Sequence, residues 1–368
     1  MKTYLALFAE GFVLAYVLTP ILIAICERFG FVDRPDGVRK LHANPVASLG
    51  GMVIAVSAGI SIMSLAVMPN EPGNLLRANQ DRLGPIILPC LLMLAVGVID
   101  DVRPLRAREK LVAQLLAATL LWLSGVTFGM GYLQTHGYLA SRAATYFLTV
   151  FWVVGITNAV NLIDGLDGLA AGVSAMVCLT MAISGLTLDT PLVALIMLPV
   201  SGALMGFLRY NFAPARIFLG DSGTLPLGFS MAAMSLIYTQ KKAAIVAIAV
   251  PLLALGLPVF DTLLSITRRF IGGTPLFAGD RGHIHHRLLH LGLLPRHVVA
   301  VLYGVTFLCC SLSVALLFAE QLAATLIIAA FALMAAVGVR ALRYLELRVT
   351  RAVLTPQAPS KSGQEWKG

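Results

Sequence analysis

Charged residues are scarce in this 368-residue sequence. Only 12% of the residues are Asp, Glu, Lys or Arg, whereas 58% are hydrophobic and the mean hydropathy is +0.86. A soluble domain of this length needs far more charge to cover its surface, so the composition excludes that class and indicates a membrane protein. A bilayer core takes roughly 20 apolar residues per helix, and most of the apolar runs here are about that long.

Cysteines are few, and none lies in a metal-binding pattern. All five fall inside apolar runs, at Cys26, Cys90, Cys178, Cys309 and Cys310. We interpret them as small buried hydrophobic residues without a redox role. Glu10, inside the first apolar run, is interpreted as a partner for a neighbouring helix or as a residue near the outer interface. The sequence also shows no internal repeat, soluble domain or linker.

The apolar runs predict an all-α polytopic membrane protein with about eleven transmembrane helices. The predicted spans are 4–26, 49–68, 85–99, 110–126, 144–162, 169–188, 191–208, 224–238, 243–264, 298–319 and 322–340. Residues 1–354 are predicted to form one integral-membrane catalytic domain. The polar stretch 355–368 is predicted to be a disordered cytoplasmic tail.

Lysine and arginine fall unevenly between the predicted loops. With eleven helices, 21 of the 27 basic residues lie on one side of the membrane, and the positive-inside rule makes that side cytoplasmic. This places the N-terminus in the periplasm and the C-terminus in the cytoplasm, in a bacterial inner membrane. Most of the positive charge behind the net +9 then lies at the inner leaflet, where it attracts anionic lipid. No nucleic-acid partner is expected.

Five polar motifs each follow an odd-numbered predicted helix, so the topology brings all five to the cytoplasmic face. They are 33–42 (DRPDGVRKLH, with Lys40 and His42), the pair Asp100 and Asp101, 161–168 (NLIDGLDG, with Asn161, Asp164 and Asp167), 211–223 (NFAPARIFLGDSG, with Asn211 and Asp221) and 280–286 (DRGHIHH, with Arg281, His283, His285 and His286). Five scattered motifs thereby become one candidate site.

The aspartates of these motifs suggest a cation site. Adjacent carboxylates at a membrane boundary repel each other and lose hydration, so Asp100 and Asp101 favour a role with a cation or protons, although a helix end meeting water is the alternative. Several aspartates without a thiolate suit Mg²⁺, or Mn²⁺, better than Zn²⁺. Since Mg²⁺ takes only one or two carboxylates, not all five aspartates need be ligands. The histidines, flanked by Arg281 and Arg287, favour a phosphate- or sugar-contacting loop over a zinc site.

The five motifs in this order resemble those of the polyprenyl-phosphate N-acetylhexosamine-1-phosphate transferases, over nearly the whole chain. The branch that makes undecaprenyl-diphospho-N-acetylglucosamine, for O-antigen and related cell-surface glycans, is the most similar. The resemblance implies catalytic roles for Asp100, Asp101, Asp164 and Asp167, and Mg²⁺ ligation by Asp221 and Asp101. Together with the motifs it predicts substrate-binding roles for Lys110, Asn161, Asn211, Arg281, His283, His285, His286, Lys40 and His42.

The implied reaction joins the sugar 1-phosphate of UDP-N-acetylglucosamine to undecaprenyl phosphate and releases UMP. An alkyl phosphate has its second pKa near 6 and is mostly dianionic at pH 7, so direct attack by the lipid phosphate is favoured over a covalent intermediate on Asp100. An N-acetylgalactosamine or N-acetyl-deoxyhexosamine donor remains open, because such sugars differ by a single hydroxyl. A homodimer also remains open.

Other classes fit less well. The muramoyl-pentapeptide transferases carry three consecutive histidines before an acidic residue, whereas this sequence reads HIHHR over 283–287. The CDP-alcohol phosphotransferase signature is missing. A transporter or flippase for lipid-linked sugars would place ionisable residues near helix midpoints and show paired halves. A polyprenyl phosphatase would release inorganic phosphate and make no sugar-lipid product.

Overall fold

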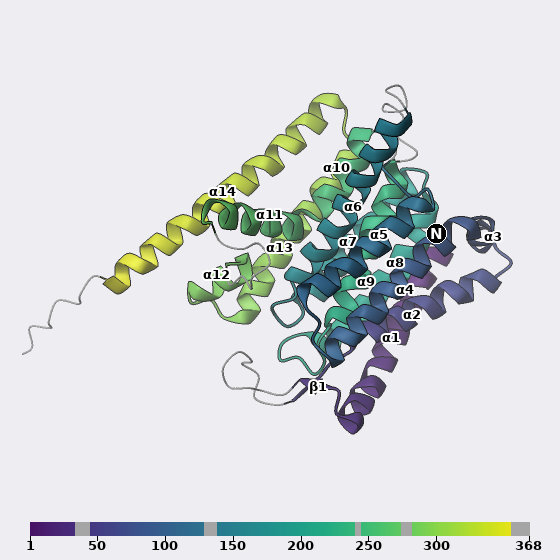
Figure 1. The fold of residues 1–368 in the computed structure, drawn as a ribbon, viewed down its shortest axis with the longest axis horizontal. Helices are drawn as coiled ribbons and strands as arrows, with labels where there is room; N and C mark the ends of the chain where they lie inside the picture. The colour runs from purple at the N-terminus through teal and green to yellow at the C-terminus, as the bar shows by residue number, and fades with distance from the viewer. Residues whose placement is uncertain (34–44, 129–137, 240–243, 274–281, 355–368) are drawn as a thin grey trace, which may run out of the picture.

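The computed structural model describes the chain except residues 34–44, 129–137, 240–243, 274–281 and 355–368, and the described part is helical almost throughout (Figure 1). Two short strands interrupt the helices. The elements are α1 (Lys2–Phe29), β1 (Val32–Asp33), β2 (Val46–Ala47), α2 (Gly50–Val67), α3 (Glu71–Ala78), α4 (Gln80–Val102), α5 (Ala107–Leu123), α6 (Tyr138–Leu162), α7 (Leu169–Thr187), α8 (Pro191–Asn211), α9 (Asp221–Thr239), α10 (Ala244–Ala254), α11 (Gly256–Ile271), α12 (Ile284–His290), α13 (Pro295–Leu317) and α14 (Gln321–Leu354).

The predicted all-α membrane architecture is confirmed in kind. Among the described residues, eight helices are long and apolar enough to cross a bilayer, and a bent pair brings the number to nine. Large apolar side chains cover the outside of the bundle, with Leu88, Phe147 and Phe151 each at least 65% exposed. Such a surface suits lipid, not water. The count of eleven and the direction of the chain across the membrane stay predictions.

The ninth predicted span, 243–264, is wrong as a single helix. The chain breaks at Leu255 between α10 and α11, and the two halves meet at 82°. Pro251 lies inside α10 and Pro258 inside α11, and a proline removes a helical hydrogen bond. Apolar length predicted the helices, but hydropathy alone carries no information about their angle. The bend matters because α11 holds part of the candidate site.

The core of the bundle lies around α7, α8 and α9. In an apolar 18-residue stretch of each of α7 and α8, 78% of the residues are buried. α8 also packs closely against α1, because a Cβ at Gly202 or Gly206 would collide with the backbone oxygen of Phe8 or Phe12. Small residues allow such close approach in membranes, where apolar burial gives little drive to association. These packed helices form the framework against which the polar loops are placed.

A small strand pair fixes the loop that precedes α9, and the sequence did not predict it. β1 and β2 are antiparallel, and Ala47 forms a parallel bridge with Ile217. The Phe218 N–H donates to the Ala47 oxygen at 2.9 Å, and the Gly50 and Gly51 N–H groups donate to the oxygens of Phe218 and Leu219, both at 3.1 Å. The start of α2 and the 213–220 loop are therefore held together.

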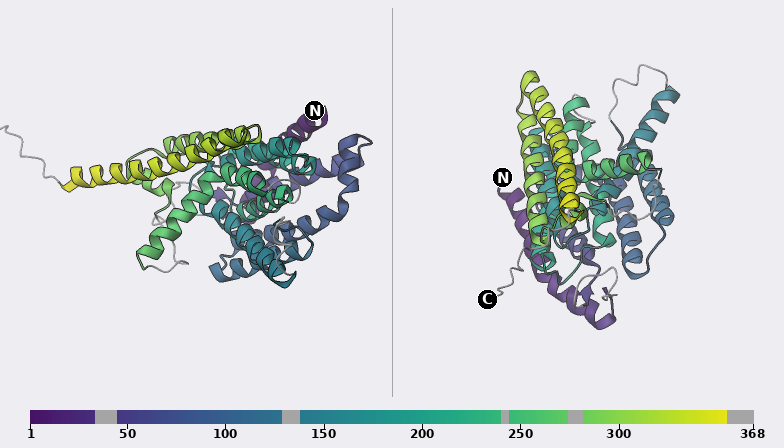
Figure 2. Two further views of the ribbon diagram at one scale, coloured as in Figure 1. Left: turned by 90° about the horizontal axis from the view of Figure 1, so that it is seen from above. Right: turned by 90° about the vertical axis from the view of Figure 1, so that its left-hand side faces the viewer.

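The C-terminal helices form one edge of the molecule. α13 packs against α7 and α10, whereas α14 lies along α13 and extends past the rest of the bundle (Figures 1 and 2). The cysteines are free, and four of the five are buried, as predicted. Glu10 is the expected helix partner, since Ser64 of α2 donates to its carboxylate at 2.8 Å. The polar tail, 355–368, lies outside the described residues.

Candidate active site

The paired aspartates lie in the last turn of α4, directly before a tight turn. Asp100 accepts a hydrogen bond from the Leu105 backbone N–H at 2.7 Å, which closes the turn between α4 and α5. Lys110, in the first turns of α5, places its ammonium 3.2 Å from Asp100 Oδ2 and 2.8 Å from Asp221 Oδ2. All three side chains are partly buried. One lysine therefore joins two acids that lie 121 positions apart in the sequence.

Asp101 reaches the first turn of α9. Its two carboxylate oxygens accept from the backbone N–H groups of Asp221 (2.8 Å) and Ser222 (3.1 Å). The first N–H groups of a helix have no partner within the helix, and the helix dipole adds positive potential there. The Asp101 carboxylate accepts from these N–H groups and places a negative charge in the positive potential of the helix start. It also lies next to Asp221, the first residue of α9.

Asp221 is held from its other side by α6. The Asn161 side-chain amide donates to Asp221 Oδ1 at 3.0 Å and to Thr224 Oγ1 at 2.8 Å. We call Asp100, Asp101, Asp221 and Lys110 the carboxylate cluster. Its members come from three helices, α4, α5 and α9, and Asn161 adds a fourth, α6. The predicted convergence of the Asp100 and Asp221 loops on one side is thereby confirmed.

The three acids of the cluster suit a divalent cation. One carboxylate oxygen from each of Asp100, Asp101 and Asp221 lies within 4.8 Å of the other two. Several oxygen ligands without a thiolate are the donor set that Mg²⁺ and Mn²⁺ prefer. Lys110 adds a positive charge beside these three carboxylates.

Asp164 lies beside the cluster, in the turn between α6 and α7. Burial, together with the nearby charges of Asp221 and Asp101, raises the pKa of its carboxyl to about 7, although a hydrogen bond from the Gly220 backbone opposes the shift. An acid with this pKa is about half ionised at pH 7, and a cation nearby would favour its ionised form. Asp164 is therefore placed to respond to charge that enters the site.

Asp167 and Asn211 contact the loop that carries Asp221. Asp167 Oδ2 accepts from the Ala215 N–H at 2.9 Å, and the buried Asn211 amide donates to the Ile217 oxygen at 2.9 Å. Both contacts lie within the motif region predicted from the sequence, and they hold the 213–220 loop in place. The catalytic role of Asp167 and the substrate-binding role of Asn211 stay predictions.

Residues 282–286, which we call the histidine segment, lie at the start of α12, and His285 of this segment packs against the turn that holds Asp164. His283 and His285 are buried and their rings stack, 5.9 Å between centroids at an angle of 3°, while His286 lies 4.2 Å from His285. A Cβ at Gly165 would collide with His285 Nε2, so this imidazole packs directly on the turn. Burial lowers the pKa of His285 to about 4, with a smaller effect from His286, and the ring is neutral at pH 7.

Asp261 of α11 is a site residue that the sequence reasoning missed. Its carboxylate lies 2.9 Å from His283 Nδ1 and also accepts from the Ile284 N–H at 2.8 Å. A signal was available, because an aspartate inside an apolar membrane segment is costly without a function. Three predicted substrate-binding residues, Lys40, His42 and Arg281, lie outside the described residues.

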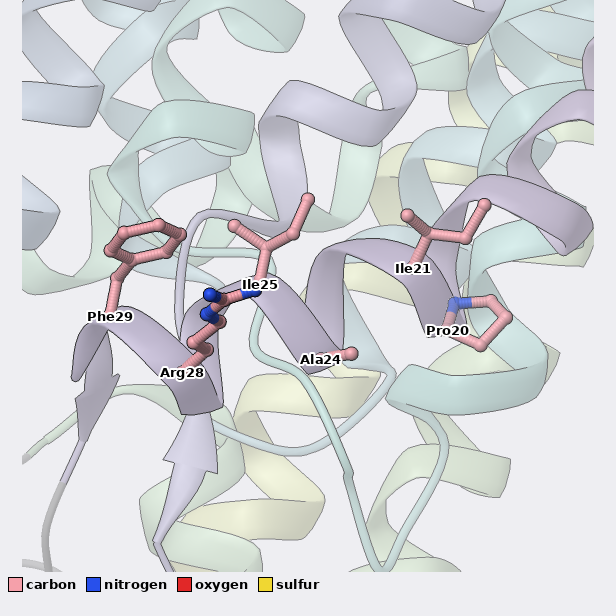
Figure 3. A pocket seen from close by; sticks show the side chains of 6 residues that line it. All are labelled: Pro20, Ile21, Ala24, Ile25, Arg28 and Phe29. Carbon is pink, nitrogen blue, oxygen red and sulfur yellow. The ribbon is translucent and has the colours of Figure 1, made fainter.

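A shallow groove on α1 is separate from these groups. It is lined by Pro20, Ile21, Ala24, Ile25, Arg28 and Phe29 (Figure 3). These side chains all come from one helix, and none belongs to the five motifs. The carboxylate cluster and the histidines therefore define the candidate active site, and the groove does not.

The three converging acids, Lys110 and the histidine segment form, within a membrane bundle, the arrangement that the motifs predict for a membrane-embedded transferase. Residues 84–239 match the model of glycosyl transferase family 4. The chain belongs to this family, within the polyprenyl-phosphate hexosamine-1-phosphate transferase superfamily, as the motifs predicted.

Curated relatives agree along most of the chain. A Bacillus subtilis protein named "Probable undecaprenyl-phosphate N-acetylglucosaminyl 1-phosphate transferase" is 36% identical over 79% of this chain and 79% of its own. The decaprenyl-phosphate N-acetylglucosaminephosphotransferase of Mycolicibacterium smegmatis is 29% identical over 79% of this chain and 76% of its own. The phospho-N-acetylmuramoyl-pentapeptide-transferase of Desulforudis audaxviator is 36% identical, over 62% of this chain and 74% of its own.

Proposed function

We propose that this protein transfers N-acetylglucosamine 1-phosphate from UDP-N-acetylglucosamine to undecaprenyl phosphate, releasing UMP. The observation that carries the proposal is the carboxylate cluster, in which Lys110 bridges Asp100 and Asp221 beside Asp101. The name of the Bacillus subtilis relative supports the same acceptor and sugar. The product begins a cell-surface glycan such as O-antigen.

The chemistry follows from the charges of the two reactants. A lipid phosphate oxygen attacks the phosphorus that carries the sugar, and the bond from that phosphorus to the oxygen of UMP breaks. Both reactants are anions, so their repulsion is the main obstacle. Lys110 lies where its ammonium offsets that repulsion, and Asp100 is placed to orient the lipid phosphate and accept any remaining proton. A phosphate that is already mostly dianionic makes a covalent intermediate on Asp100 unnecessary.

Asp221 and Asp101, with Asp100 beside them, would hold a magnesium ion, and manganese fits the same oxygens. When bound, a divalent ion offsets the charge of the diphosphate and stabilises the departing UMP. The residues fit this role because their oxygens converge while Asn161 and the start of α9 fix their directions.

The site belongs at the cytoplasmic face of a bacterial inner membrane. The polyprenyl tail lies in lipid while the nucleotide sugar arrives from the cytosol, so the reaction requires a site at the boundary between them. The distribution of 21 of 27 basic residues on the side of the motifs supports this orientation. It also makes the N-terminus periplasmic.

A muramoyl-pentapeptide substrate is the second candidate, since the Desulforudis audaxviator relative carries that name. The histidine segment argues against it, because Ile284 separates His283 from His285. One experiment decides between them. Purified protein is incubated with undecaprenyl phosphate, magnesium and a radiolabelled donor: UDP-N-acetylglucosamine, UDP-N-acetylgalactosamine, a UDP-N-acetyl-deoxyhexosamine or the UDP-muramoyl-pentapeptide. The lipid extract is then chromatographed.

We expect a labelled lipid diphosphate from UDP-N-acetylglucosamine, and none when EDTA is present. Label transferred from the muramoyl donor instead would overturn the proposed substrate. Full turnover in EDTA would overturn the metal assignment. A burst of UMP in the absence of lipid would favour the covalent route through Asp100, and release of inorganic phosphate without a lipid product would indicate a phosphatase.

A further inference from the structure

α11 holds the histidine segment, residues 282–286, at two points. Near the start of the helix, Asp261 contacts His283 and the Ile284 backbone. Two turns further on, Arg268 donates to the Gly282 backbone oxygen at 2.9 Å. Positions 261 and 268 are seven apart and share one face of a helix. One face of α11 therefore grips the segment on both sides of His283.

The Asp261 contact fixes the orientation of the His283 ring. A carboxylate can only accept hydrogen bonds, so Nδ1 of His283 must carry a proton, and this sets the tautomer of a neutral ring. Asp261 and His283 are only 5% and 4% exposed, which removes water as a competing partner. The second carboxylate oxygen is used by the Ile284 N–H, so the backbone and the ring are oriented together.

His285 is the residue that this arrangement presents to the site. Its ring stacks on His283 and packs against Gly165, next to Asp164. Both of its ring nitrogens are buried, and neither has a hydrogen-bond partner in the described part of the protein. A buried polar group without a partner is destabilising. The two nitrogens therefore suit polar atoms that the substrate brings to the Asp164 turn.

We propose that Asp261 is a positioning residue for the nucleotide-sugar substrate, which it serves by holding the histidine segment so that His285 faces the Asp164 turn. This inference rests on the proposed function, because it assigns the segment to the nucleotide sugar and the carboxylate cluster to the phosphates. Asp261 itself touches no reacting atom.

The test compares Asp261→Asn with the wild type in steady-state kinetics, varying UDP-N-acetylglucosamine and undecaprenyl phosphate separately. Asparagine keeps the shape but can accept from only one of the two donors. We expect KM for UDP-N-acetylglucosamine to rise about tenfold to hundredfold, the change that corresponds to hydrogen bonds to a buried charged group. KM for undecaprenyl phosphate should stay within twofold. Asp261→Glu, which restores the charge, should recover part of the loss.

Two further variants separate positioning from general destabilisation. Ser313→Ala removes another buried side-chain hydrogen bond, to the Val250 oxygen at 2.8 Å on α10, and should leave both KM values unchanged. In a double-mutant cycle, Asp261→Asn combined with His283→Ala should lose far less than the product of the two single losses, because Asp261 acts through His283. If the double variant does not fold, the kinetics of Asp261→Asn alone carry the test.

Several outcomes would overturn the inference. They are an unchanged KM for the nucleotide sugar, equal losses for both substrates, strict additivity in the cycle, or the same loss in Ser313→Ala. A wild-type protein that transfers no sugar phosphate would refute the proposed function alone. The inference is then decided by melting temperature with UDP-N-acetylglucosamine or the UDP-muramoyl-pentapeptide and magnesium: it stands if the ligand-induced shift is smaller in Asp261→Asn, and falls if the wild type shows no shift.

Discussion

The carboxylate cluster and the histidine segment meet at the same turn, but the fold holds them differently. The cluster lies between α4, α5, α6 and α9, inside the region that the family model matches, and each of its acids has a hydrogen bond to a second element or turn. The histidine segment lies outside that region and is held by α11 through Asp261 and Arg268. Under the proposed function, the groups that handle the phosphates are part of the packed bundle, whereas the groups that contact the rest of the substrate are held by a single helix, α11.

The strongest way to break the comparison is to remove the centre of the cluster. Asp221→Ala takes away an acid that contacts Lys110 and Asn161, and we expect product formation to fall by at least about a thousandfold, because a carboxylate proposed to hold the divalent cation is lost. UMP release measures the effect. Asp81→Asn, an exposed acid at the start of α4, is the matched control and should be as active as the wild type; comparable activity in the two variants would refute the assignment.

Removing the lysine should have the next largest effect. In Lys110→Met the carboxylates of Asp100 and Asp221 lose the ammonium between them, and we expect kcat to fall about a hundredfold, since the two anionic reactants are no longer offset. Arg108→Met, on an exposed position two residues earlier in α5, should change kcat less than twofold. A loss confined to thermal stability, with kcat preserved, would make Lys110 structural.

A substitution in the Asp164 turn tests the position of the histidine segment. Gly165→Ala introduces a Cβ where His285 Nε2 lies, so the imidazole must move, and we expect KM for the nucleotide sugar to rise about tenfold while kcat changes little. Gly155→Ala, in α6 with open space around the new Cβ, is the control. His285→Ala should make the Gly165→Ala change harmless, and an additive loss in the pair would argue against the contact.

The smallest expected effect is a pH dependence of magnesium use. The pKa of Asp164 is raised to about 7, so its carboxyl is mostly neutral below that pH and mostly ionised above it. Cation affinity is therefore reduced as the pH falls through 7, and half-saturating magnesium should decrease several-fold between pH 6 and pH 8. In Asp164→Asn this slope should flatten; an unchanged slope would mean that another group titrates.

Much of this arrangement could be predicted from the sequence. Apolar runs located the helices, and motif order together with topology predicted that Asp100, Asp164 and Asp221 lie at one site. Lys110 does join Asp100 to Asp221, and Asp164 lies close enough to feel the charge of Asp221. The 82° bend after α10 could not be predicted, because hydropathy is insensitive to direction. The strand pair at Ala47 was missed because two-residue strands have no periodicity. Asp261 was missed because it stands alone in an apolar segment, outside any motif.

Asp101 has two roles in the structure, and this limits which residues could replace it. The same two oxygens that face the acids also begin a helix, by accepting the first N–H groups of α9. A cysteine or histidine at this position would offer a softer metal a ligand but would leave that helix without its cap. The proposed choice of a hard cation and the start of α9 therefore depend on the same carboxylate, so replacing Asp101 would change both at once.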